Sequence, residues 1–295
     1  MKVVTINKIS LKSRILTYLR NPLSLFMLIS VIIAVIITVS VLLFIVLYII
    51  INGIPYLKPS LFSFVYNSTN VSVFPAIATT IYMVLLSLLF SAPIGILCAV
   101  YLVEYAKRGN KLVKYIRITT ETLSGIPSIV YGLFGLLFFV TFLKMGFSIL
   151  AGSLTLSIMI LPLIIRATEE ALKSVPDIYR EGSFGLGATR LRTVFIIVLP
   201  SAIPGILAGI ILSIGRIVGE TAALIYTAGT VAKIPENLGN SARTLSVHMY
   251  SLSSEGLHTN EAYATAVVLL ITVLLINFLA NFIANRFKRG KNNAG

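Results

Sequence analysis

Six stretches of the sequence, each 18 to 30 residues long, are almost free of charged side chains. Crossing the hydrocarbon core of a bilayer as a helix takes about 20 apolar residues. None of the stretches alternates like a barrel strand, so helices, which satisfy their backbone groups internally, are the expected spanning elements. The sequence therefore predicts an all-α polytopic membrane protein with six transmembrane helices. The stretches are Leu23–Ile51, Phe74–Val103, Leu123–Leu143, Ser148–Ile165, Ile203–Ala228 and Ala262–Ala284.

The composition supports this class of protein. The chain has 295 residues, of which 57% are hydrophobic and 12% charged, with a mean hydropathy of +0.96, whereas soluble domains are about one-quarter charged. The net charge of +14 comes from Lys and Arg between the apolar stretches, so no nucleic-acid partner is expected. One cysteine and two distant histidines provide neither a disulfide nor a Cys-His metal site, and no cofactor is expected.

The distribution of Lys and Arg predicts the orientation. Nineteen of the 24 lie in the N-terminal segment, the second and fourth gaps and the C-terminal tail, and four lie in the other gaps. The positive-inside rule then places both termini in the cytoplasm. The expected organisation is a basic segment (1–22), a six-helix membrane domain (23–285) and a basic tail (286–295). Residues 5–20 predict either an interfacial amphipathic helix or a positive tail that only sets the topology.

The fourth gap, residues 166–200, is longer than a typical connection between helices. Ser174-Val-Pro-Asp177 offers a capping serine, a first-turn proline and an acidic residue, and Gly187 is the expected end of a short helix. A second helix is expected from there into the fifth stretch. Gly182 and Gly185 each lower helix propensity by about 1 kcal/mol. They also remove bulk, which favours docking into a groove on another protein. The alternative is a surface helix hairpin without a partner.

This gap resembles the cytoplasmic motif of ABC-importer permeases, which reads Glu-Ala-Ala, three residues, Gly, nine residues, Ile-x-Leu-Pro. Here it is Glu181-Gly182-Ser183, Gly187 and Ile197-Val-Leu-Pro200, with both spacings kept. In that family the element is the coupling helix that docks on the ATP-hydrolysing subunit. The resemblance implies that Glu181, Gly182, Ser183 and Gly187 are docking residues. The sequence has no G-x-x-x-x-G-K-[ST] loop, so ATP hydrolysis is expected from separate subunits and the chain is not expected to be an enzyme.

The fifth stretch contains Arg216 and Glu220 in the sequence IGRIVGETAA. A charge near the centre of a bilayer costs about 2.5–3.5 kcal/mol on insertion scales, and such residues usually face a bundle interior or an ion path. Four residues apart on one helix, the two side chains share a face and are close enough to pair. Arginine suits an oxyanion because its planar fork donates two hydrogen bonds. The alternative is a structural pair that locks the helix to a neighbouring subunit.

The segment Gly215-Arg216-x-x-Gly219-Glu220-Thr221-Ala222 resembles the signature of phosphate ABC-importer permeases. Residues 124–135 resemble the start of their third helix, and residues 245–256 with 262–266 are similar to the A-type of the two paired subunits. Ala223 departs from this pattern, since the A-type usually has proline there. The resemblance implies an ABC-importer permease fold, a substrate pathway through Arg216 and Glu220, and four kinds of partner. These are a C-type permease subunit, two ATP-binding subunits, an extracytoplasmic phosphate-binding protein and the membrane.

Alternatives stay open for the role of Arg166, for the transported ion and for the class of transporter. Arg166, at the cytoplasmic end of the fourth stretch, belongs to the pathway by resemblance or is an interfacial arginine that snorkels to the headgroups. An ABC permease for another oxyanion, such as molybdate or sulfate, would keep the coupling motif. In a secondary transporter Glu220 would relay a proton, but such proteins have matching interrupted helices in two halves, which the sequence lacks.

Overall fold

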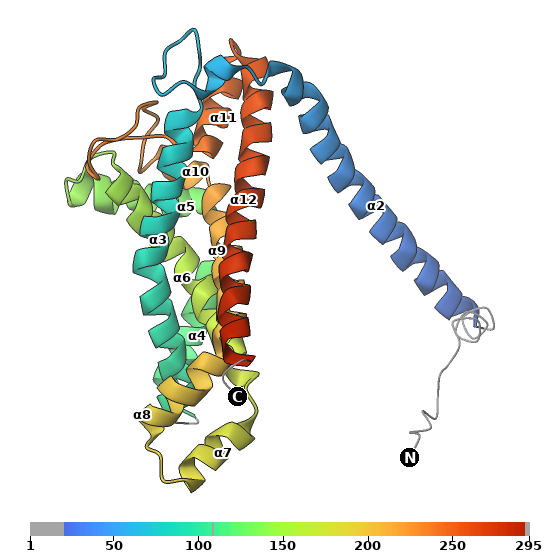
Figure 1. Ribbon diagram of the computed structural model, residues 1–295, viewed down its shortest axis with the longest axis vertical. Helices are drawn as coiled ribbons and strands as arrows, with labels where there is room; N and C mark the ends of the chain where they lie inside the picture. The colour runs from blue at the N-terminus through green and yellow to red at the C-terminus, as the bar shows by residue number, and fades with distance from the viewer. Residues whose placement is uncertain (1–20, 108, 293–295) are drawn as a thin grey trace. The chain divides into compact units, whose positions relative to one another are not determined.

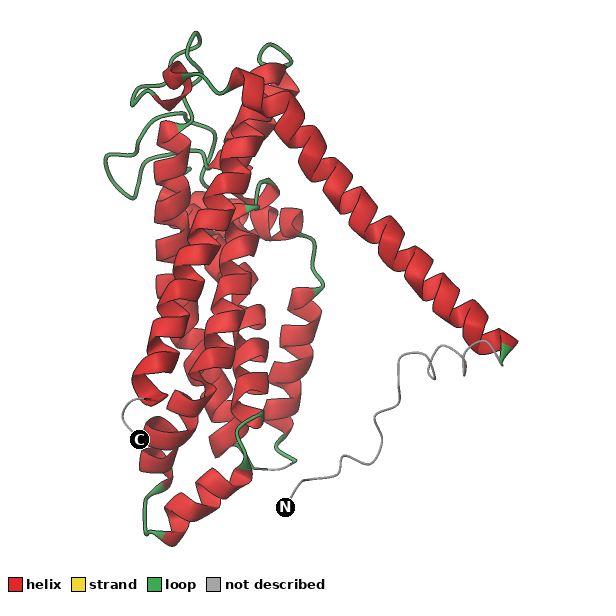
Figure 2. Ribbon diagram, turned by 45° about the vertical axis from the view of Figure 1, so that its right-hand side comes forward, coloured by secondary structure: helices red, strands yellow, loops and turns green. Residues whose placement is uncertain are grey.

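The computed structural model describes residues 21–107 and 109–292, with side chains to residue 282. Every regular element in this part of the chain is a helix (Figure 2), which confirms the all-α prediction. The amphipathic segment expected at residues 5–20 lies outside the described residues. The chain divides into two units, residues 1–52 and 53–295, and each is described by itself.

The first unit consists of helix α2 (Pro22–Gly53), which continues to the first residue of the second unit. It is uninterrupted over 32 residues and contains no charged side chain. Apolar side chains are exposed all around it, from Leu23 to Ile51. A helix that is apolar on every face suits a lipid environment, so α2 confirms the first predicted span.

The second unit is a bundle with short helices at both ends (Figure 1). Its elements, in chain order, are η1 (Ile54–Tyr56), η2 (Pro59–Phe62), α3 (Phe74–Val100), η3 (Tyr101–Tyr105), α4 (Lys111–Ser124), α5 (Ser128–Gly135), η4 (Leu136–Phe142), α6 (Ile149–Lys173), α7 (Asp177–Gly185), α8 (Arg190–Thr193), η5 (Val194–Val198), α9 (Leu199–Val218), α10 (Ala222–Ile225), α11 (Leu245–Glu255) and α12 (Thr259–Asn292). Of these, η1 and η2 are 3₁₀ turns, and η3 to η5 are π-helical.

Helix α6 lies at the centre of this unit, because it packs along both α3 and α9. Serines join α3 to α6: Ser157 Oγ lies 3.0 Å from the carbonyl oxygen of Ser87. Small residues join α6 to α9: a Cβ added to Gly205 would lie 2.6 Å from the Cβ of Ala171. Close packing of small residues and buried hydroxyls is typical of helices that associate inside a membrane.

Five helices are long and apolar enough to cross a membrane among the described residues, and the pair formed by α4 and α5–η4 adds a sixth if it counts as one span. Those two segments meet at an angle of 103°. The third predicted span, Leu123–Leu143, is therefore not one continuous helix, because it is interrupted near its start. The chain bends at Gly125-Ile-Pro127, since a residue before proline avoids the helical region and proline lacks an N–H. The hydroxyl of Tyr131 donates to the Leu123 carbonyl at 2.7 Å across the bend.

The fifth predicted span also ends earlier than expected. The helical run that starts at Arg190 ends at Val218 rather than at Ala228. Gly219 is its C-cap, and the chain then forms only the single turn of α10. The apolar sequence continues past the break, so hydrophobicity alone did not mark it.

The fourth predicted span and the loop after it need smaller corrections. Helix α6 continues past Ile165 to Lys173, and Ser174 is its C-cap rather than the N-cap of the next helix. Pro176 occupies the N-cap of α7. The expected end is confirmed: Gly187 has φ = +80° just beyond α7, a conformation that glycine adopts without steric cost.

Helices α7 and α8 lie at one end of the bundle with the end of α12, and α11 lies at the other end (Figure 1). The Lys- and Arg-rich second and fourth gaps thus share one end with the start of the C-terminal tail. This arrangement agrees with the orientation predicted from charge.

Candidate functional site

The expected coupling segment projects from the cytoplasmic end with an apolar surface. Leu186 is 91% exposed and Ile178 is 70% exposed, and apolar side chains exposed together on one surface are typical of an interaction site. Glu181, Gly182 and Gly187 are exposed on the same segment. A groove of about 550 Å³ lies beside them, lined by Ile178, Tyr179, Gly182, Ser183, Leu186, Gly187, Ala188, Arg192, Ile196 and Ile197.

Ser183 differs from the other three predicted docking residues because its side chain is buried. Its Oγ lies 2.8 Å from Oγ1 of Thr193. The Thr193 hydroxyl also donates to the Thr189 carbonyl at 3.1 Å. The Ser183 hydroxyl therefore holds α7 against α8 through this contact, and a larger residue at this position would separate the two helices.

Arg180 anchors α7 to the membrane helices, a role that the sequence did not reveal. Its Nη2 lies 2.7 Å from Oε1 of Glu104, at the end of η3, and Nη1 lies 3.0 Å from Oδ1 of Asp177. Nη2 and Nη1 also donate to the carbonyls of Leu172 at 2.9 Å and Val175 at 2.8 Å. The hydrogen bond with Glu104 raises the pKa of Arg180 above its ordinary value, so the guanidinium stays charged. One side chain thus connects α7 with the ends of α3 and α6.

Arg216 lies in the last turn of α9 and is half-buried. It forms no hydrogen bond or ion pair with any described residue. It lines a groove of about 530 Å³ together with Asn277 of α12. The Asn277 Oδ1 is buried and has no hydrogen-bond partner in the described part of the chain. The Arg216 guanidinium therefore has free hydrogen-bond donors at a groove whose lining, apart from Arg216 and Asn277, is apolar.

Glu220 lies beyond the end of α9 and is buried, with 8% exposure. Its Oε1 accepts a hydrogen bond from the Ala223 N–H at 3.0 Å, and its backbone carbonyl accepts one from Ser246 Oγ at 2.6 Å. Within the described residues no ion pair joins it to Arg216. The expectation that both side chains share one helix face is wrong, because α9 ends at Val218, between them.

Arg166 is exposed on α6 and belongs to a different pocket, of about 220 Å³. The sequence reasoning missed the ion pairs beside it. Buried Glu169 lies 2.5 Å from Nη2 of Arg117 and 2.7 Å from Nζ of Lys173. Because Gly209 packs against Ala167, Arg216 lies about 10 Å farther along the bundle than Arg166, at 1.5 Å per residue. The two predicted pathway arginines do not form a single site.

A buried arginine lies at the extracytoplasmic end. Arg243 is 6% exposed, with its guanidinium carbon 4.7 Å from the ring centroid of Tyr66. Its Nε and Nη2 have no hydrogen-bond partner among the described residues. His248 is fully buried beside Tyr66. Burial, and second the charge of Arg243, lower the pKa of His248 to about 3, so this imidazole is neutral at physiological pH.

Comparison with known proteins agrees with this architecture. The family described as "Binding-protein-dependent transport system inner membrane component" matches residues 91–293. A probable ABC transporter permease protein, YqgI of Bacillus subtilis, is 37% identical over 79% of this chain and 85% of that protein. The phosphate transport system permease protein PstA 1 of Mycobacterium tuberculosis is 35% identical over 74% of this chain and 72% of that protein. PstA of Yersinia pestis is 36% identical over 70% of both chains.

Solved structures share the fold at lower identity. A bacterial ABC transporter involved in import of the acidic polysaccharide alginate matches with a TM-score of 0.63 and 20% identity, over 92% of this chain and 97% of that one. The MetNI methionine ABC transporter, in inward-facing conformations, matches with a TM-score of 0.56 and 22% identity, over 73% of this chain and 94% of that one.

The helical bundle, its apolar spans and its projecting cytoplasmic helix define a multi-pass membrane protein of the ABC-importer permease fold. The chain belongs to the family of binding-protein-dependent transport system inner membrane components. It is a permease subunit of the cell membrane and not an enzyme.

Proposed function

We propose that the chain is the A-type permease subunit of an ATP-driven phosphate importer. Support for phosphate comes from relatives named as phosphate transport permeases, at 35–36% identity over at least 70% of this chain. The observation that carries the proposal is Arg216, a half-buried guanidinium without a partner in the described chain that faces a groove within the membrane bundle. A planar fork of free donors matches the oxygens of phosphate.

In this mechanism two ATP-binding subunits hydrolyse ATP, and one of them docks on the surface formed by Glu181, Gly182 and Gly187. Motion of α7 reaches the membrane helices through Arg180, since its guanidinium contacts Glu104 and the carbonyl end of α6. The path containing Arg216 and Glu220 then opens alternately to the two sides. An extracytoplasmic phosphate-binding protein supplies the ion, and binding within the path is weak so that the ion can leave.

A C-type permease forms the other half of the pathway. Of the two glycine pairs on α9, Gly205 and Gly209 pack on α6, but added Cβ atoms at Gly215 and Gly219 would meet no other described helix. A second permease packed on this open small-residue face would bring its side chains next to Arg216. Arg166, with the cations around Glu169, would lie where the ion leaves.

The test is phosphate uptake in cells that express the whole transporter, comparing wild type with Arg216→Gln and Glu181→Lys. We expect Arg216→Gln to abolish uptake while all subunits still co-purify, and Glu181→Lys to weaken co-purification of the ATP-binding subunits. Matched controls are Lys144→Gln and Glu236→Lys, which make the same charge changes at exposed extracytoplasmic positions. Loss of assembly with Arg216→Gln would show that this arginine is structural. Uptake of molybdate or sulfate, but not phosphate, would contradict the assigned substrate.

A further inference from the structure

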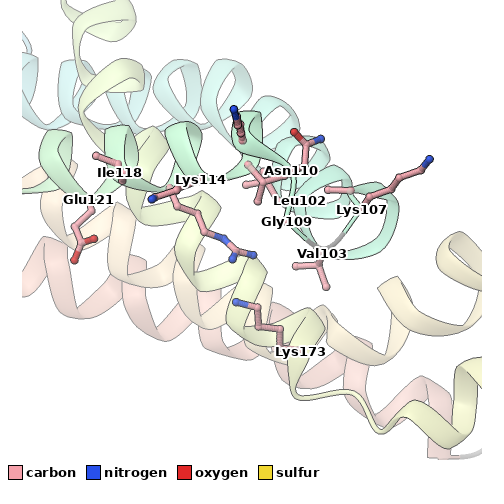
Figure 3. Close-up of a pocket in the computed structure, with 13 residues that line it drawn as sticks. Leu102, Val103, Lys107, Gly109, Asn110, Lys114, Ile118, Glu121 and Lys173 are labelled. Carbon is pink, nitrogen blue, oxygen red and sulfur yellow. The ribbon is translucent and has the colours of Figure 1, made fainter.

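A second basic pocket lies at the cytoplasmic end of the bundle, separate from the groove that contains Arg216. Its volume is about 610 Å³, and its lining comes from η3, from the loop between η3 and α4, from α4 and from α6 (Figure 3). Five cations line it, and Glu121 is the one carboxylate among its described lining residues. The cations are Lys107, Lys111, Lys114, Arg117 and Lys173.

Three of these cations have no anionic partner among the residues that the structure describes. Arg117 and Lys173 pair with Glu169, but no ion pair involves Lys107, Lys111 or Lys114 within residues 21–107 and 109–282. The positive-inside rule explains why lysines lie on this side of the membrane. It does not explain why they converge on one pocket. Unpaired charges of one sign around a concave surface attract a multivalent anion.

Apolar side chains also line the pocket, and they limit the class of anion that it fits. Leu102, Val103, Val113 and Ile118 line it between the cations. A free inorganic anion would lose part of its hydration shell against these apolar side chains, and they would offer it no hydrogen bonds in return. A phosphodiester headgroup that carries a glycerol backbone and acyl chains matches both the charged and the apolar parts.

Helix α4 shows the same pattern along its surface. Lys111, Lys114 and Arg117 recur every three residues, and the next residue in each case is apolar and exposed: Leu112 at 53%, Tyr115 at 66% and Ile118 at 49%. The cationic row therefore runs beside an apolar row on one helix surface. Such a surface offers cations to the headgroup of a lipid and apolar side chains beside them to its acyl chains.

We infer that this pocket binds the phosphate headgroup of an anionic phospholipid of the cytoplasmic leaflet, with the acyl chains along Leu112, Tyr115 and Ile118. Basic pockets between membrane helices on this side are suited to such headgroups. The inference does not depend on which ion the transporter imports, because its ligand is a component of the bilayer.

The test is native mass spectrometry of the full transporter complex, purified in detergent and given equal amounts of phosphatidylglycerol and phosphatidylcholine. We expect selective retention of phosphatidylglycerol by the wild type. In the triple variant Lys107→Gln, Lys111→Gln, Lys114→Gln, retention should fall at least about tenfold, since each cation near an anionic surface contributes roughly a factor of five. The matched control is Lys58→Gln, Lys144→Gln, Lys233→Gln, which removes three exposed lysines outside the pocket.

Several results would overturn the inference. Equal retention of both lipids, or equal loss in the pocket and control variants, would show that the pocket does not select an anionic headgroup. Displacement of the lipid by excess inorganic phosphate would identify the ligand as the free ion. Loss of the second permease subunit from the pocket variant would identify the surface as a subunit interface. Phosphate uptake is measured separately, so failure here leaves the proposed function unaffected.

Discussion

Arg180 and Arg216 both lie in segments that the sequence marks as functional, but their surroundings are opposite. Arg180, on the coupling helix, donates to two carboxylates and two backbone carbonyls. Arg216, in the last turn of α9, has no hydrogen-bond or ion-pair partner among the described residues. Both side chains are partly shielded from solvent. The difference therefore lies in whether hydrogen bonds and ion pairs within the chain satisfy each guanidinium.

A guanidinium whose donors are used within the chain holds elements together, and removing it leaves its acceptors unpaired. A guanidinium with free donors in a membrane groove is available to an ion or to another subunit. The comparison therefore separates an arginine that holds elements of the chain together from an arginine for which we propose contact with the transported ion. Each of the following changes tests that separation.

The largest effect is expected from Arg180→Met. Glu104 would remain buried, with a side chain only 7% exposed, and would lose its cation. Breaking a buried pair on one side costs about 3–5 kcal/mol. We expect a loss of this order in the free energy of unfolding, together with reduced co-purification of the ATP-binding subunits. Thermal unfolding of the purified complex measures the first quantity.

The double variant Arg180→Met, Glu104→Gln is the control for this prediction. It removes the unpaired charge as well, so it should recover part of the lost stability. A cost below about 1 kcal/mol for Arg180→Met would contradict the anchoring role, because surface ion pairs are worth that little.

The two glycine pairs of α9 provide the next test. A Cβ at Gly209 would collide with the Cβ of Ala167, whereas one at Gly215 would meet nothing within 4 Å outside its own helix. Gly209→Val should therefore lower the stability of the chain by about 1–3 kcal/mol through overpacking. Gly215→Val should leave the isolated chain nearly unchanged and weaken its association with the second permease. Equal destabilisation by both would remove the argument for an open face beside Arg216.

These residues also show what sequence alone could predict. The apolar stretches predicted the spans, since hydrophobicity over about 20 residues is a property of composition. Gly187 predicted the end of the coupling helix, since its positive φ favours glycine. The pairing of Arg180 with Glu104 joins residues 76 positions apart, and no local pattern reports such a contact. The break after Val218 was missed because apolar residues resume at Ala222 after only Gly219, Glu220 and Thr221, and with it the environment of Glu220 was missed.

Arg243 lies between the two extremes, because it stacks on Tyr66 but leaves two nitrogens unpaired. It contributes to the low pKa of His248, about 3 compared with an ordinary 6.5. Below pH 6.5 the unfolded state binds a proton that the folded state does not, so stability falls as the pH is lowered. The expected slope is about 1.4 kcal/mol per pH unit below that value.

The measurement is thermal unfolding between neutral and mildly acidic pH. His248→Gln should remove this part of the pH dependence, whereas His258→Gln, at the half-exposed second histidine, should retain it. An unchanged slope in His248→Gln would show that the imidazole is not held neutral by its surroundings.

The smallest effect on stability, and the most direct test of the comparison, is expected from Arg216→Gln. No described acceptor loses a partner when this guanidinium is removed, so the free energy of unfolding of the isolated chain should change by less than about 0.5 kcal/mol. The same substitution should abolish phosphate uptake by the complete transporter, because the groove keeps its shape but loses its charge. A chain that is clearly destabilised by Arg216→Gln would place this arginine with Arg180 as a structural residue. A complex that is destabilised while the isolated chain is not would identify the second permease, rather than the ion, as the partner that satisfies its donors.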